Sequence, residues 1–303
     1  MIMGNKLKGY IFGFIAAVTY GMNPLFALPL LRGGMDASAV LFYRYLLAVP
    51  MIAVIMLFRH SSFKVSGKEM LLLVVFGILM GISSLTLFES YGYMNAGIAS
   101  TILFVYPLMV AVIMALFFKE KMTVVTISAL VLATVGIAML YKGEGGATLS
   151  LVGTMLVMAS ALSYAFYIVG VKHTPIKNVP TLTVTFYVLL YGMMIFLFNL
   201  LFKGGMRVPH GALQWGSAMG LALFPTAISF LCTTRAIALI GSTPTAILGA
   251  MEPVTAVLIG LAVFSESLTA RDVSGILMII VAVMLVILFN GRRASFRPHR
   301  RRR

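Results

Sequence analysis

Ten stretches of apolar residues, each about twenty residues long, follow one another along the chain, with short polar segments between them. Each stretch is long enough to cross the roughly 30 Å hydrocarbon core of a bilayer as an α-helix. The predicted spans are 9–31, 37–58, 70–92, 96–118, 122–141, 149–171, 182–202, 213–236, 243–264 and 270–290. The predicted fold class is therefore all-α, a polytopic membrane protein with ten transmembrane helices.

The fourth and ninth spans repeat one another in sequence. They read AGIASTILFVYPLMVAVIMALFFKEK and STPTAILGAMEPVTAVLIGLAVFSES. Pro107 stands 13 residues before Glu120, and Pro253 stands 13 residues before Glu266. A repeat of this size in a hydrophobic chain is typical of transporters built from two related halves.

The repeat divides the chain into three parts. We predict a first five-helix repeat at 1–142, a second five-helix repeat at 149–290, and a basic tail at 291–303. Because five crossings is an odd number, the second half must enter the membrane in the opposite orientation to the first. The pattern therefore predicts an inverted-topology repeat, which places a substrate site near the midplane between the halves.

Composition narrows the class of protein. Hydrophobic residues make up 61% of the 303 residues, and charged residues only 10%, against roughly 45–50% and 25% in soluble domains. The net charge of +15 lies in loops and in the tail, which favours membrane topology over nucleic-acid binding. The single cysteine, Cys232, excludes a disulfide within the chain.

Loop charges predict the orientation. Ten crossings put both termini on one side, and sixteen lysines and arginines fall in the loops and termini of that side against five on the other. The five are Arg32, Lys142, Lys203, Arg207 and Arg271. We expect the protein to lie in the cytoplasmic (inner) membrane. Because positive residues accumulate on the cytoplasmic side of such proteins, we expect both termini in the cytoplasm.

Several short motifs resemble a known family. They are TYGMNP at 19–24, FYRYLLA at 42–48, the block from Pro107 to Glu120, SYAFY at 163–167, and the pair Glu252-Pro253 that runs on to Glu266. Together they resemble the drug/metabolite transporter superfamily, in its ten-helix type with two EamA domains, over residues 8–290. The resemblance implies a secondary transporter of small metabolites, commonly an exporter, with a central cavity between the halves.

The sequence does not favour an enzyme. All four histidines lie in predicted loops or in the tail, so no His or Cys cluster is expected within the spans. Glycine-rich phosphate-binding signatures are absent as well. We therefore predict no catalytic residues, no metal site and no cofactor.

Intramembrane polar groups are the candidates for a substrate site, because an ionisable group in hydrocarbon is costly and commonly functional. Glu252 lies about nine residues, roughly 14 Å, into its span, which is near the midplane. Its repeat counterpart is Tyr106, and both precede a proline that frees a helical carbonyl. With Tyr20, Asn23 and Tyr164, these residues form the predicted substrate-binding set. The alternative for each is helix–helix contact alone.

Other residues are predicted to kink helices or to gate the path. Pro24, Pro107 and Pro253 interrupt their spans. Arg44 and Glu89 lie at similar depths below the outer surface and could form an ion pair, either as a structural clasp or as an outer gate.

Two glycine pairs are predicted to be close-packing helix faces. Gly77 and Gly81 are separated by three residues, and so are Gly216 and Gly220.

The function predicted from these observations is a secondary transporter, an exporter of small metabolites or amphipathic compounds that works by alternating access. Its partners would be a small-molecule substrate and the lipid bilayer, with proton coupling through Glu252 as a further hypothesis and no nucleic acid. Two alternatives stay open, a membrane-embedded structural or signalling partner without transport activity and a passive channel.

Overall fold

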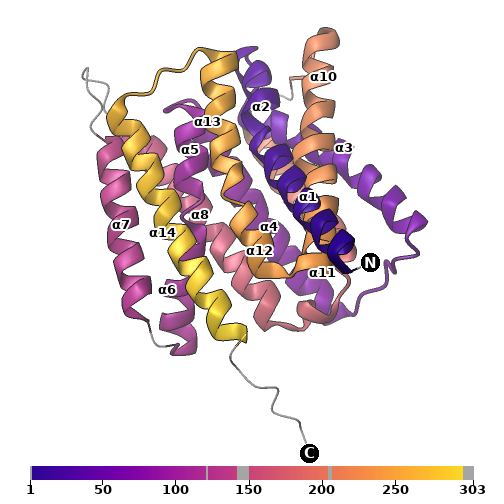
Figure 1. The fold of residues 1–303 in the computed structure, drawn as a ribbon. Helices are drawn as coiled ribbons and strands as arrows, with labels where there is room; N and C mark the ends of the chain where they lie inside the picture. Colours follow the sequence, from indigo (N-terminus) through magenta and orange to yellow (C-terminus); the bar gives the residue numbers. More distant parts are fainter. Residues whose placement is uncertain (1, 121, 142–149, 204–206, 296–303) are drawn as a thin grey trace, which may run out of the picture.

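The computed structural model describes residues 2–120, 122–141, 150–203 and 207–295, and every regular element in these residues is helical (Figure 1). Nine helical stretches in this part of the chain are long and apolar enough to span a membrane, and Val124–Leu140 is a shorter apolar helix. The protein is therefore an all-helical, multi-pass membrane protein, and the ten predicted crossings are confirmed.

Several crossings consist of more than one helix, because the chain breaks within the membrane. In the first half the elements are α1 (Ile2–Gly21), α2 (Asn23–Arg32), α3 (Ala37–Phe58), α4 (Gly67–Ser90), α5 (Ala96–Leu103), α6 (Tyr106–Phe118) and α7 (Val124–Tyr141). In the second half they are α8 (Leu151–His173), the 3-10 helix η1 (Pro175–Asn178), α9 (Thr181–Lys203), α10 (Gly211–Ala222), the π-helical η2 (Leu223–Ile228), α11 (Ser229–Ile240), α12 (Ser242–Leu248), α13 (Met251–Phe264) and α14 (Ala270–Ser295).

Two faces of the bundle are used below as landmarks (Figure 1). The side on which α1 begins and α6 and α11 end is called the N-terminal face. The side on which α2 and α13 end and α5 begins is called the opposite face.

Polar residues at the loop boundaries start the long helices. Asp36 accepts a hydrogen bond from the N–H of Ser38 at 2.8 Å and caps α3. Ser66 and Glu69 form a capping box at the start of α4, in which each side chain accepts from the other residue's N–H. Each cap satisfies backbone donors that the first helical turn leaves free.

The repeat seen in the sequence is present in the backbone. Both α6 and α13 end at a residue in the left-handed conformation, Lys119 with φ 55° and Ser265 with φ 53°. The glutamate that follows donates its N–H to the carbonyl six residues earlier, at 3.3 Å in the first half and 3.0 Å in the second. The same turn is therefore built twice, once at each face of the bundle.

The two halves interlock. Three crossings pack against their own repeat counterparts, in the pairs α3–α9, α5–α13 and α7–α14. The α1–α11 contact in one half of the bundle corresponds to the α8–α4 contact in the other. The interface between repeats therefore runs through the middle of the molecule, where the candidate site lies.

One predicted glycine face is confirmed and one is partly wrong. A Cβ at Gly77 would lie 2.6 Å from the Cβ of Tyr191, so α4 and α9 approach closely there. A Cβ at Gly220 would meet the Phe26 ring at 2.5 Å. At Gly216 no described atom lies within 4 Å of an added Cβ and the residue is exposed, so Gly216 is not part of a close-packing face.

Candidate functional site

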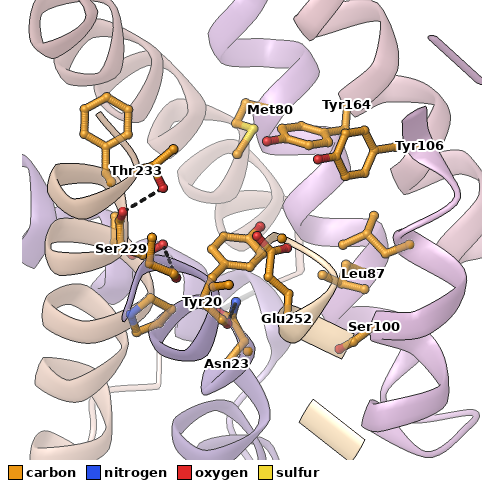
Figure 2. Close-up of a pocket in the computed structure, with 18 of the residues that line it drawn as sticks. Tyr20, Asn23, Met80, Leu87, Ser100, Tyr106, Tyr164, Ser229, Thr233 and Glu252 are labelled. Atoms are coloured by element: carbon orange, nitrogen blue, oxygen red, sulfur yellow. Dashed lines mark hydrogen bonds between the residues drawn. The ribbon is translucent and has the colours of Figure 1, made fainter. Parts of the chain in front are cut away.

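A cavity of about 440 Å³ lies between the two repeats, and residues of both halves line it (Figure 2). All five residues of the predicted substrate-binding set are among the lining residues, and Arg44 is another. The five are Tyr20, Asn23, Tyr106, Tyr164 and Glu252. The structure thus brings together residues from the first, fourth, sixth and ninth crossings.

The break between α1 and α2 positions Tyr20 and Asn23. Pro24 has no N–H, so the carbonyl of Tyr20, four residues earlier, loses its usual helical donor. The Asn23 side chain replaces it, with Nδ2 donating to the Tyr20 carbonyl at 2.8 Å. Asn23 is buried, and its Oδ1 has no hydrogen-bond partner among the described residues. The described residues therefore leave one buried acceptor of this cavity-lining residue unsatisfied.

The break between α12 and α13 positions Glu252 in the same way. Pro253 cannot donate to the Gly249 carbonyl, which instead accepts the N–H of Glu252 at 2.9 Å. A Cβ at Gly21 would lie 2.6 Å from the Glu252 carbonyl oxygen, so the first and ninth crossings meet backbone to backbone. This contact places Glu252 beside the end of α1, on the same side of the cavity as Tyr20 in Figure 2.

Tyrosines from the fourth and sixth crossings form another wall. The rings of Tyr106 and Tyr164 meet edge to face with centroids 4.8 Å apart. Tyr167, three residues further along α8, stacks on Tyr164 at 5.9 Å. These rings give the cavity a broad aromatic surface with hydroxyl groups at its edge, which suits ligands with both apolar and polar parts.

A third proline, Pro225, positions the Thr226 hydroxyl that forms a hydrogen bond with Arg44. Because Pro225 lacks an N–H, the Leu221 carbonyl accepts the hydroxyl of Thr226 at 2.9 Å within the π-helical segment. The same hydroxyl accepts Nε of Arg44 at 2.9 Å. Arg44 is only 7% exposed, and its guanidinium lies 5.8 Å from the Phe88 ring centroid. This arrangement joins the second crossing to the eighth.

The remaining predicted residues lie outside this cavity. Glu89 is half-buried and lines a second cavity, of about 620 Å³, on the opposite face. Pro24, Pro107 and Pro253 stand at helix breaks and are not among the residues that line either cavity. The predicted interaction between Arg44 and Glu89 stays a prediction.

Several lining residues were missed by the sequence analysis. Tyr45, Tyr91, Tyr167, Ser100 and Thr233 all contribute to the cavity wall. Tyr45 directly follows Arg44 in the FYRYLLA motif, and Tyr167 lies three residues after Tyr164, on the same helix face. Tyr167 could have been found from this spacing, whereas adjacent residues on a helix do not share a face, so spacing does not identify Tyr45. Tyr91 lies in the turn after α4, and no periodicity identifies it.

The wall of the central cavity holds few acidic or basic side chains. Among the described lining residues, Arg44 and Glu252 are the two with acidic or basic side chains, and hydroxyl and amide groups make up the other polar members. No group of three or more His, Cys, Asp or Glu side chains that could hold a metal ion is found in the described part of the chain.

Known proteins resemble this chain over nearly its whole length. The model of the EamA-like transporter family matches residues 7–142 and 151–288. The chain is 26% identical over 299 residues to the "Uncharacterized inner membrane transporter YicL" of Salmonella typhimurium, covering 96% of this chain and 99% of that protein. It is 29% identical over 218 residues to an "Uncharacterized transporter" of Archaeoglobus fulgidus, covering 72% and 76%.

A solved crystal structure shares the fold. It superposes with a TM-score of 0.69 at 16% sequence identity and covers 94% of this chain and 98% of its own.

Proposed function

Because the chain belongs to the EamA-like transporter family, we propose that it is a secondary transporter that exports a small metabolite or amphipathic compound across the cytoplasmic membrane by alternating access. One relative, YicL, is named an inner membrane transporter, which supports this location. The excess of positive loops on one side supports the orientation with both termini in the cytoplasm.

The central cavity carries the proposal. Its volume of about 440 Å³ lies in the range of small-molecule sites, which is roughly 300–1,000 Å³. Four of the crossings that line it break at or beside a proline, and in three of them another group of the chain satisfies a carbonyl that the proline leaves free. Irregular backbone inside a membrane is tolerated where protein or a water-filled cavity surrounds it, and transporters use such segments to bind substrate.

The lining favours a solute of low net charge with an apolar body. Tyrosine rings supply apolar area, and the Asn23 amide and nearby hydroxyls supply hydrogen bonds. Arg44 already donates to Thr226, and its flat face lies over Phe88. Both interactions occupy part of the guanidinium, which leaves the Glu252 carboxyl as the more available ionisable group.

Glu252 is also the residue through which we propose that a proton is coupled to transport. Glu252 is half-buried in the wall of the central cavity, so its carboxyl is within reach of water that enters from an open face. Proton binding and release at this position would then depend on which face the cavity opens to. The competing role is a protonated Glu252 that only donates a hydrogen bond to a neighbouring helix.

Purified protein in liposomes tests the proposed function. Vesicles loaded with a pool of labelled small metabolites should release one or more of them faster than protein-free vesicles, and release should saturate with concentration. Release that rises linearly with concentration would indicate a passive channel. No protein-dependent release from any pool would favour a structural or signalling role and would overturn the proposal.

A further inference from the structure

The second cavity lies on the opposite face, directly beyond the central one. Its volume is about 620 Å³, and it is lined by the ends of α2 and α4, the turn that leads into α5, and Glu266 after α13. We call this cavity the vestibule. Tyr91 lines both the vestibule and the central cavity. The two cavities are therefore neighbours, and Tyr91 is the lining residue that they share.

Tyr91 is held in this position by packing against neighbouring groups. Its side chain is buried, and its ring lies 5.4 Å from that of Phe88. The Phe88 ring in turn lies under the guanidinium of Arg44 on the cavity wall. Ser100, one turn into α5, lines only the central cavity, whereas Asn95 lines only the vestibule. These two residues mark the two sides of the barrier.

A tight seam between α5 and α13 closes the barrier from the side. A Cβ at Gly97 would lie 2.8 Å from the Cα of Val257, so the two backbones touch. After the left-handed turn at the end of α13, the Glu266 carboxylate reaches the start of α5, where Oε1 accepts the N–H of Ala96 at 3.3 Å. A carboxylate at a helix N-terminus also interacts favourably with the positive end of the helix dipole.

The equivalent seam at the N-terminal face is not closed. The repeat counterparts of α13 and α5 are α6 and α12, and these two helices do not form a comparable packing contact in the described residues. Glu120, the counterpart of Glu266, is exposed. Ile237, the counterpart of Tyr91, lines the central cavity and is 45% exposed. The same turn and helix pair therefore adopt two different arrangements at the two faces.

We propose that Tyr91 is the gate between the central cavity and the vestibule, and that Glu266 is the latch that keeps this gate closed. The inference rests on the alternating access proposed above. Opening towards the opposite face requires the Glu266 carboxylate to leave the Ala96 N–H and the end of α13 to move away from the start of α5. Tyr91 then no longer separates the two cavities.

Cysteine labelling tests the gate and needs no transported solute, so its failure is distinguishable from failure of the transport assay. The chain has a single cysteine, and Cys232→Ser gives a cysteine-free background. Into it we place Ser100→Cys, on the cavity side, or Asn95→Cys, on the vestibule side. A membrane-impermeant maleimide is applied to right-side-out and to inside-out vesicles, and the face from which Asn95→Cys reacts identifies the vestibule side.

We expect Ser100→Cys to react slowly from the vestibule side and rapidly from the other side. Glu266→Ala should raise the vestibule-side rate about tenfold, the factor for one hydrogen bond to a charged group. Glu266→Gln, which keeps a neutral acceptor, should give a smaller increase. Tyr91→Ala should raise the same rate, whereas Tyr91→Phe should not.

Two further variants complete the test. Glu120→Ala, the matched change in the other repeat, should not raise the vestibule-side rate. Gly260→Ala keeps Glu266 but should also raise this rate, because a Cβ at Gly260 would clash with the Glu266 carboxylate and displace it from the Ala96 N–H. Equal labelling of Asn95→Cys in every variant reports that the fold is intact. The proposal is overturned if Glu266→Ala and Gly260→Ala leave the labelling rate of Ser100→Cys unchanged. It is also overturned if Ser100→Cys already reacts rapidly from the vestibule side when Tyr91 and Glu266 are both present.

Discussion

The hydroxyl of Thr226 makes two hydrogen bonds at once, and removing it should destabilise the protein measurably. It accepts Nε of the buried Arg44 and donates to the Leu221 carbonyl that Pro225 leaves free, both at 2.9 Å. Thr226→Val keeps the shape of the side chain but leaves a guanidinium N–H and a carbonyl without their partner. A hydrogen bond to a charged group contributes ~1.5–3 kcal/mol and a neutral one ~0.5–1.5 kcal/mol.

We expect Thr226→Val to lower the free energy of unfolding by about 2 kcal/mol. This value is at the low end of the sum, since single hydrogen bonds in membrane proteins average only ~0.6 kcal/mol. With an unfolding entropy of about 2.1 cal/mol/K per residue, a loss of about 2 kcal/mol in this 303-residue chain should lower the midpoint of thermal unfolding in detergent by roughly 3 °C. Thr226→Ser, which keeps the hydroxyl, should stay near the parent.

Thr233→Val is the matched control, because its hydroxyl also lines the cavity and donates at 2.9 Å to the Ser229 carbonyl within its own helix. Its cost should be well below that of Thr226→Val. In a double-mutant cycle, Thr226→Val and Arg44→Met should be non-additive by at least ~1 kcal/mol. Equal losses for the two valine variants, or strict additivity with Arg44→Met, would refute the assigned role of this hydroxyl.

Three other predictions concern the site and the topology. Glu252→Gln should fold normally and lose transport driven by a pH gradient while solute exchange without a gradient survives; gradient-driven flux equal to that of the parent would end the coupling hypothesis. Reporter fusions after Arg293 and in the 59–68 loop should report the cytoplasm and a fusion in the 142–149 loop the outside, and a cytoplasmic signal from the last would contradict the predicted orientation. If Arg44 and Glu89 interact, each single alanine change should lower folded yield and the double change should recover part of it; additive losses would show that they do not.

The membrane crossings could be predicted from the sequence because capping, polar and charged residues at their ends mark where they begin and end. The predicted spans 37–58 and 96–118 coincide with α3 and with α5–α6. Asp36 caps the first of these, and polar or charged residues end both. The fifth crossing was less distinct, since Val124–Leu140 is shorter than the other spans. Length and apolar content therefore determine how many crossings exist, and caps determine where they begin.

Only part of the candidate site could be predicted from the sequence. Repeat spacing identified Tyr106 and Glu252, and both line the cavity. The hydrogen-bond partner of Arg44 could not be predicted in this way, because Thr226 is 182 residues away in the sequence. Its hydroxyl is positioned by a π-helical turn, which no sequence pattern predicts. Tyr91 was missed for a similar reason, since its position between two cavities depends on how the repeats pack rather than on its own neighbours.

Solute counterflow tests the central claim most directly. Liposomes containing the protein are preloaded with an excess of one unlabelled solute that the pooled release assay has identified, and a trace of the labelled solute is then added outside. A carrier whose single cavity faces one side at a time should accumulate label transiently above its equilibrium level, and the accumulation should vanish when the internal solute is omitted. A passive monotonic approach to equilibrium, unchanged by the internal solute, would contradict alternating access.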